Sequence, residues 1–72
     1  MRIRTEREDG VIISTIKVTF LAWYGEYESA VCIDDGDWRI LEGYDTAKQA
    51  KMGHSKYQTM SKEELLKFKY IG

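Results

Sequence analysis

The sequence predicts an α+β domain in which an antiparallel meander of three or four strands is packed by one helix, with a short helix at the C-terminal end. Three observations predict this fold class. Polar and apolar residues alternate along Val11–Phe20, which is typical of a strand. Turn-forming residues at 9–10 and 34–37 divide the first half into short segments. After Tyr44 the apolar residues change to a helical spacing.

The strands are expected at Ile3–Arg7, Val11–Phe20, Tyr27–Ile33 and Trp38–Tyr44, where β-type composition is bounded by turn residues. In the second segment the even-numbered positions 12–22 are mostly apolar, whereas the odd-numbered positions from 15 onward are polar. Because side chains alternate between the two faces of a sheet, we expect the even-numbered side chains to face the core.

A helix is predicted to begin at Thr46, because Thr46 and Gln49 have the spacing of a capping box. Four residues with the spacing three, four and three then share about an 80° arc, which is expected to face the sheet. They are Ala47, Ala50, His54 and Tyr57. Glycine costs about 1 kcal/mol in a helix interior, so we expect Gly53 either where the helix backbone meets a strand or where the helix loosens.

A second short helix is predicted after Ser61, which stands three residues before Glu64 in another capping pattern. Its residues Leu65 and Phe68 would face inward, with Leu66 beside them. The last residues, 67–72, alternate in polarity and are equally compatible with an edge strand.

Length and composition indicate a single domain over residues 1–72 with a small core. Cys32 is the only cysteine, which precludes an internal disulfide and fits a reducing compartment. No apolar run is long enough to span a bilayer, and the first residues lack the apolar core of a signal peptide. We therefore expect a cytoplasmic protein that does not contact membranes.

Charge is distributed unevenly along the chain. Residues 1–45 contain ten acidic and five basic residues, whereas residues 46–72 contain six lysines and two glutamates. The basic part offers a nucleic-acid-binding surface, for which the candidate residues are Lys48, Lys51, Lys56 and Lys62. Because this part contains no arginine and the whole chain has a net charge of −1, nucleic-acid binding is the alternative hypothesis.

The residues that could support catalysis or metal binding are few. His54 is the only histidine, and its place on an apolar helix face favours a packed imidazole bonded to a backbone carbonyl. Cys32 is expected to be a small buried residue, without a nucleophilic role. The acidic loop 34–37 lacks the spacing of a calcium-binding loop. We therefore predict no catalytic residue, metal or cofactor.

Aromatic and acidic residues are concentrated in the strand region, where the rings either build the core or remain exposed beside the acids as a docking surface for a protein partner. Tryptophan and tyrosine are favoured anchors at interfaces, and so small a chain cannot bury all of its rings. The candidate partner-binding residues are Trp23, Tyr24, Glu26, Glu28, Asp34, Asp35, Asp37 and Trp38. With so small a core, we also expect homodimerisation through an exposed strand.

Three segments, Ile13–Thr15, Tyr27–Val31 and Tyr44–His54, resemble in their order a family of short uncharacterised proteins of tailed phages and prophages. The family pattern has a Ser-Thr strand, a Glu-Thr-type strand and a helix of the form Thr-x-x-x-Ala-x-x-Gly-His, and the resemblance spans about residues 12–57. Family members often carry a longer segment with an Asp-His pair after the first strand, which this chain replaces with residues 22–25.

The resemblance implies a phage or prophage origin and action in the cytoplasm of a bacterial host, and it supplies no catalytic residues. By analogy with other small phage proteins, it implies a non-enzymatic accessory protein that binds a host or viral macromolecule. Inhibitors of a host defence system, such as anti-CRISPR proteins, are one class of this kind. A small nucleic-acid-binding protein is the alternative.

Overall fold

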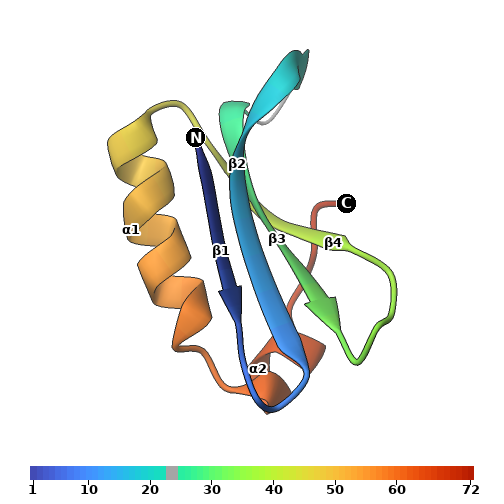
Figure 1. Ribbon diagram of the computed structural model, residues 1–72. Coiled ribbons are helices and arrows are strands. Elements are labelled where there is room, and N and C mark those ends of the chain that lie inside the picture. The colour runs from blue at the N-terminus through green and yellow to red at the C-terminus, as the bar shows by residue number, and fades with distance from the viewer. Residues whose placement is uncertain (23–24) are drawn as a thin grey trace.

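The computed structural model describes the backbone of residues 1–22 and 25–72 and the side chains of residues 1–18 and 25–72. Four strands form one antiparallel sheet in the order β1-β2-β3-β4, with α1 against one face and α2 at one end (Figure 1). The elements are β1 Arg2–Glu6, β2 Val11–Ala22, β3 Gly25–Ile33, β4 Arg39–Tyr44, α1 Ala47–Gln58 and α2 Lys62–Leu66. The predicted α+β fold class is confirmed.

The predicted turns join the strands of this meander. Gly10 has a φ of 87° between β1 and β2. Asp34 and Asp35, which follow β3, have φ values of 51° and 60°, a region that aspartate tolerates better than most residues. The Asp34 N–H also donates to the Gly10 carbonyl at 2.9 Å, so the two turns support each other at one end of the sheet.

Helix α1 begins as the capping pattern predicts. The Thr46 side chain accepts from the Gln49 N–H at 3.1 Å, and the Gln49 side chain accepts from the Thr46 N–H at 3.3 Å. The buried residues of α1 are Ala50, Gly53, His54 and Tyr57, whereas Ala47 is only half-buried. A Cβ at Gly53 would stand 1.9 Å from the Tyr44 hydroxyl oxygen, so glycine is where it was expected, at a close approach to a strand.

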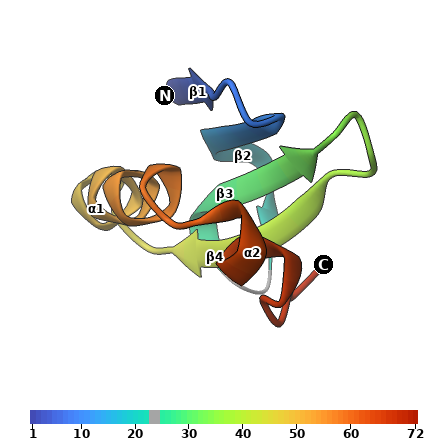
Figure 2. The same ribbon diagram turned by 90° about the horizontal axis from the view of Figure 1, so that it is seen from below.

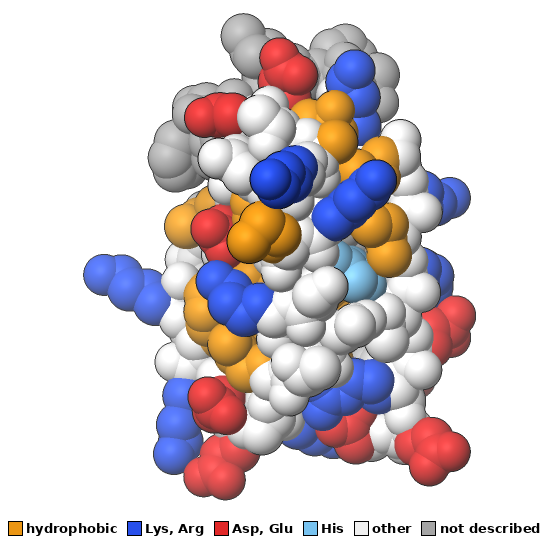
Figure 3. All heavy atoms as spheres, turned by 90° about the vertical axis from the view of Figure 1, so that its left-hand side faces the viewer, with side chains coloured by type: hydrophobic (Ala, Val, Ile, Leu, Met, Phe, Trp, Pro, Cys, Tyr) orange, Lys and Arg blue, Asp and Glu red, His pale blue; other side chains and the backbone are white. Residues whose placement is uncertain are grey.

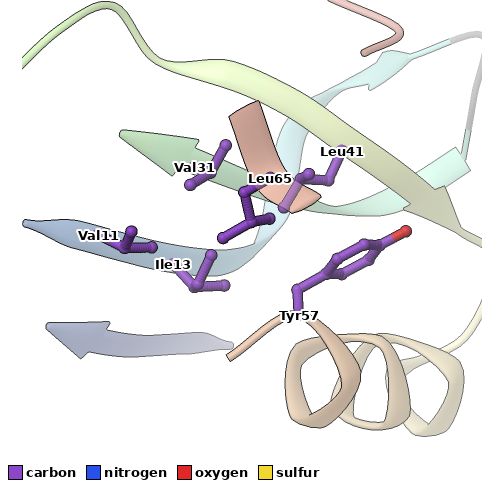
Figure 4. Packing of buried hydrophobic residues seen from close by; sticks show 6 residues of the cluster. All are labelled: Val11, Ile13, Val31, Leu41, Tyr57 and Leu65. Carbon is purple, nitrogen blue, oxygen red and sulfur yellow. The ribbon is translucent and has the colours of Figure 1, made fainter. Parts of the chain in front are cut away.

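The apolar core lies between α1, α2 and one face of the sheet. Its buried cluster consists of Val11, Ile13, Val31, Leu41, Tyr57 and Leu65 (Figure 4). Val11, Ile13 and Thr15 of β2 therefore face the core, and the described even-numbered residues of the strand lie on the opposite face, where they are only half-buried. The expectation that the even-numbered side chains face the core is wrong, because the core face also accommodates hydroxyl groups.

Helix α2 and the residues after it close the far end of the core. Leu65 is fully buried, as predicted, but Leu66 is 62% exposed and does not join it. The Ile71 N–H donates to the Ile40 carbonyl at 3.0 Å, and the Ile40 N–H donates to the Gly72 carbonyl at 2.9 Å. The final residues thus lie along the outer edge of β4, opposite β1 in the sheet (Figure 2).

Candidate functional site

The covered face of the sheet holds a buried chain of polar side chains centred on His54. His54 Nδ1 lies 2.7 Å from Thr15 Oγ1, and His54 Nε2 lies 2.9 Å from Thr5 Oγ1. Thr15 Oγ1 lies 2.6 Å from Ser29 Oγ, to which the Tyr44 hydroxyl donates at 2.9 Å. The chain connects β1, β2, β3 and β4 to α1, so it joins every strand to the helix.

The hydrogen bonds of this chain have one consistent direction. Thr5 donates its hydroxyl proton to Gln58 Oε1 at 2.9 Å, so its oxygen accepts from a proton on His54 Nε2. In a neutral imidazole Nδ1 then accepts from Thr15, whose oxygen in turn accepts from Ser29. With His54 as the neutral Nε2–H tautomer, each hydroxyl proton and the ring N–H of the chain is donated to the next member.

His54 is therefore held by side-chain hydroxyls, and the expected bond to a backbone carbonyl is replaced by bonds to Thr5 and Thr15. The ring is 3% exposed, and little of it reaches the surface beside α1 (Figure 3). Burial lowers the pKa of His54 and raises the pKa of Tyr44 to about 12. Both shifts favour the neutral forms that the hydrogen-bond chain requires.

Cys32 does not join this chain. It belongs to the even-numbered side of β3, on the face away from α1, and its Sγ–H donates to the Gly36 carbonyl at 3.2 Å. The sheet thus separates Cys32 from His54, and the buried thiol holds the loop that follows β3.

The other face of the sheet, which no helix covers, carries a groove of about 460 Å³. We call this the open face. It is lined by Arg2, Arg4, Ser14, Ile16, Glu28, Ala30, Trp38 and Ile40. The floor is formed by half-buried side chains of the strands, and Trp38 is 46% exposed. An exposed tryptophan beside aliphatic side chains gives this face the composition of an interface core.

Basic groups flank the apolar part of the open face. The Arg4 guanidinium carbon lies 5.9 Å from the centre of the Trp38 ring, within the range of a cation–π contact. Arg4 Nε also pairs with Glu6 at 3.2 Å, while Arg2 is exposed at the same edge of the groove. The groove therefore combines an aromatic anchor, an aliphatic floor and arginine groups able to bind a carboxylate.

The structure brings only part of the predicted docking surface together. Glu28 and Trp38 line the same groove. Glu26 is exposed near the start of β3, and the exposed loop residues Asp34, Asp35 and Asp37 follow the opposite end of that strand. Trp23 and Tyr24 lie outside the described residues. The predicted acidic residues are thus divided between the two ends of β3.

The residues that the sequence hypothesis omitted are Arg2, Arg4, Ser14, Ile16, Ala30 and Ile40. The sequence contains a pattern that could have identified Arg2 and Arg4. In the first strand segment charged residues occupy positions 2, 4 and 6, alternating with Ile3 and Thr5. This pattern predicts an edge strand whose charged side chains share one face, and the register with β2 places that face beside Ser14 and Ile16.

The lysines of the alternative hypothesis have different surroundings. Lys48 and Lys51 are exposed on α1, whereas Lys56 pairs with Glu42 at 3.2 Å and Lys62 with Asp34 at 2.9 Å. On the α1 side of the molecule basic side chains are interspersed with other side chains and do not form one continuous patch (Figure 3). Two of these lysines are therefore partly neutralised by acids.

A second cavity, of about 610 Å³, opens at the seam between β4 and α1. Its lining includes Glu42, Lys56, Met52 and Gly53. The Tyr57 hydroxyl donates to Glu42 at 2.8 Å, and burial together with this bond raises the pKa of Tyr57. The charged groups at this seam are thus engaged in joining the helix to the sheet.

Within residues 1–22 and 25–72, no cluster of three or more histidine, cysteine or acidic side chains is placed to hold a metal ion. In the same described part of the chain, no helix has the length and apolarity needed to cross a membrane.

No family model, no curated protein and no solved structure matches this chain. The resemblance to the phage and prophage family therefore stays a prediction, and the geometry of the two faces of the sheet is the basis for a functional proposal.

Proposed function

We propose that this chain is a non-enzymatic binding protein that docks a protein partner on the open face of its sheet. The observation that carries the proposal is the groove in which exposed Trp38 lies beside Ile40, Ile16 and the arginine pair. An apolar anchor of this kind, surrounded by groups that exclude water, is the arrangement that supplies most of the energy of protein interfaces.

The charges of the groove define the partner's chemistry. Arg2 and Arg4 fit a surface that presents carboxylates next to an apolar side chain. A protein surface fits better than a nucleic acid, because Glu28 lies in the same groove and the chain has a net charge of −1.

The resemblance to tailed-phage and prophage proteins supports a setting for this activity. In that setting the chain is an accessory protein acting in the bacterial cytoplasm, and its partner is a host or viral protein. A component of a host defence system, as for anti-CRISPR proteins, is the partner class that we propose to test first.

The test compares two surfaces in a capture experiment from host lysate. The groove variant is Trp38→Ala with Ile40→Ser, and the loop variant is Asp37→Lys with Glu26→Lys. We expect the wild-type chain and the loop variant to retain the same protein, and the groove variant to lose it. Circular dichroism of each variant confirms that its fold is intact.

The identified partner is then titrated against purified chain, and in parallel single-stranded DNA and RNA are titrated at increasing salt. Loss of the protein partner by the loop variant alone would overturn the groove assignment in favour of the acidic residues. Salt-sensitive nucleic-acid binding that falls in a Lys48→Glu, Lys51→Glu variant would instead support the alternative function.

A further inference from the structure

Strand β1 forms an edge of the sheet, and its hydrogen bonds show which of its backbone N–H and C=O groups bond to β2 and which point outward. The Arg7 N–H donates to the Val11 carbonyl at 2.8 Å, and the Lys17 N–H donates to the Met1 carbonyl at 3.2 Å. These bonds fix the odd-numbered residues of β1 as the ones that bond to β2, since hydrogen-bonded pairs alternate along an antiparallel ladder. The N–H and C=O groups of Arg2, Arg4 and Glu6 therefore point away from the sheet.

In the described part of the chain, no other helix or strand covers this edge. In the sheet β1 pairs with β2 alone, and Figure 2 shows the strand at the outer limit of the molecule with α1 on the side of the sheet and nothing beyond it. The side chains of Arg2, Arg4 and Glu6 are exposed. An uncovered edge of this kind is a template for another strand.

The charges along the same edge are self-complementary. Even-numbered residues read Arg2, Arg4, Glu6 and Glu8, that is two positive charges followed by two negative ones. When a second β1 runs antiparallel with Thr5 opposite Thr5, Arg4 lies opposite Glu6, and Arg2 faces Glu8 in the turn that follows β1 of the second copy. Every charge then meets its opposite, and the paired residues Arg4 and Glu6 are those whose backbone groups point outward.

Other registers are disfavoured by the same charges. Moving the second strand by two residues in one direction places Arg4 opposite Arg4, and by four residues places Arg2 opposite Arg4. Like charges directly opposite each other destabilise a strand pair. A shift by one residue would align outward-pointing backbone groups with inward-pointing ones. The edge therefore specifies one pairing.

We propose that two copies of this chain associate through β1 in the Thr5-to-Thr5 register, forming one continuous sheet. The two-fold axis is perpendicular to the sheet, so both helices α1 lie on one side and both open faces on the other. The dimer thus places both apolar grooves on one side, with the arginines beside them paired to the second copy, and it does not depend on the proposed function. The dimer can therefore be tested with the purified chain alone, without any partner protein.

The test uses charge swaps and sedimentation equilibrium over a wide range of protein concentration. Arg4→Glu and Glu6→Arg each place like charges opposite one another twice in the dimer, and each is expected to weaken self-association about tenfold. The double variant Arg4→Glu, Glu6→Arg restores opposite charges in every pair and should dimerise like the wild type. A mixture of the two single variants should form a heterodimer.

Glu26→Arg is the matched control, because it makes the same change on another exposed strand position. Backbone hydrogen exchange gives a second readout. The amides of Arg4 and Glu6 should become protected as the concentration rises, whereas those of Ile3 and Thr5, which already bond to β2, should not change.

A wild-type chain that stays monomeric at every concentration would overturn the proposal. So would a dimer that is unaffected by both single charge swaps, or one that the double variant and the mixture fail to restore.

Discussion

The two faces of the sheet differ in which kinds of side chain they bury and which they leave exposed. The covered face buries Thr15 and Ser29 completely, with their hydroxyls bonded to each other and the Thr15 hydroxyl bonded to His54. The open face leaves Ile16 and Ile40 half-buried around an exposed tryptophan. The covered face thus buries polar groups beside the apolar core cluster, whereas the open face leaves apolar side chains in an outer groove.

The comparison shows that satisfied hydrogen bonds can decide which face becomes the core. Burying a hydroxyl without a partner costs roughly 1–3 kcal/mol, but here each hydroxyl of the chain has partners. No buried side-chain nitrogen or oxygen among the described residues lacks a hydrogen bond. The apolar residues left on the open face are then available for a partner.

The largest expected effect separates the two faces on a single strand. Ile13→Ala removes a fully buried side chain from the core cluster and should lower the free energy of unfolding by about 3 kcal/mol. Ile16→Ala, on the open face, should lower it by about 1 kcal/mol or less, because the side chain is already partly in water. Urea denaturation of both variants measures the difference.

Ile13→Val, which should cost about 1 kcal/mol, keeps the test informative where the alanine variant fails to fold. Equal losses at positions 13 and 16 would contradict the assignment of Val11, Ile13 and Thr15 to the core face of β2.

The sequence predicted where the strands and helices lie, but it did not predict which face of β2 is buried, because that depends on contacts between distant residues. Turn residues, capping residues such as Thr46, and the spacing of Ala50, His54 and Tyr57 are local signals, and the elements that they predict are present. Which face of β2 is buried depends on whether Thr15 finds partners at Ser29 and His54, 14 and 39 residues away. Periodicity alone counts Thr15 as a polar residue and assigns it to water.

The candidate site was predicted in part for the same reason. Glu28 and Trp38 were identified by residue type, and both line the groove. Arg2 and Arg4 join them only because β1 pairs with β2 in a register that brings Arg4 opposite Ser14. That register is a tertiary property, although the alternation of charges in β1 was visible in the sequence.

The second prediction compares the same substitution on the two faces. Ser29→Ala removes the acceptor of the Tyr44 hydroxyl and the partner of Thr15, so we expect a loss of about 2 kcal/mol in the free energy of unfolding. Ser14→Ala, at the open face, should change it by less than about 0.5 kcal/mol. Thermal and urea denaturation under identical conditions provide the measurement.

A Ser29→Ala chain as stable as the Ser14→Ala chain would show that the buried hydroxyl chain contributes nothing beyond packing. In that case the hydrogen bonds of the buried hydroxyls would not explain why the covered face became the core.

The smallest expected effect is the pH dependence that His54 confers on the covered face. Burial lowers the pKa of His54 in the folded chain below its ordinary value of 6.5, so at mildly acidic pH the unfolded chain binds more protons. Stability from this group is therefore fully present above about pH 6.5 and decreases as the pH falls toward the folded pKa. A protonated Nδ1 could no longer accept from Thr15, which is the local reason for the loss.

Because His54 is the only histidine, its ring protons report the titration without ambiguity, and NMR spectra of the folded and urea-unfolded chain give both pKa values. His54→Gln removes the titration, so its stability should not show the decrease between about pH 6.5 and the folded pKa that the wild type shows. The pKa of Asp9 is lowered by its hydrogen bond to Arg7, and that group acts in a separate, more acidic window. A folded His54 pKa at or above the unfolded value would mean that the folded chain does not disfavour the charged imidazole, and this would contradict the assignment of Nδ1 as the acceptor of the Thr15 hydroxyl.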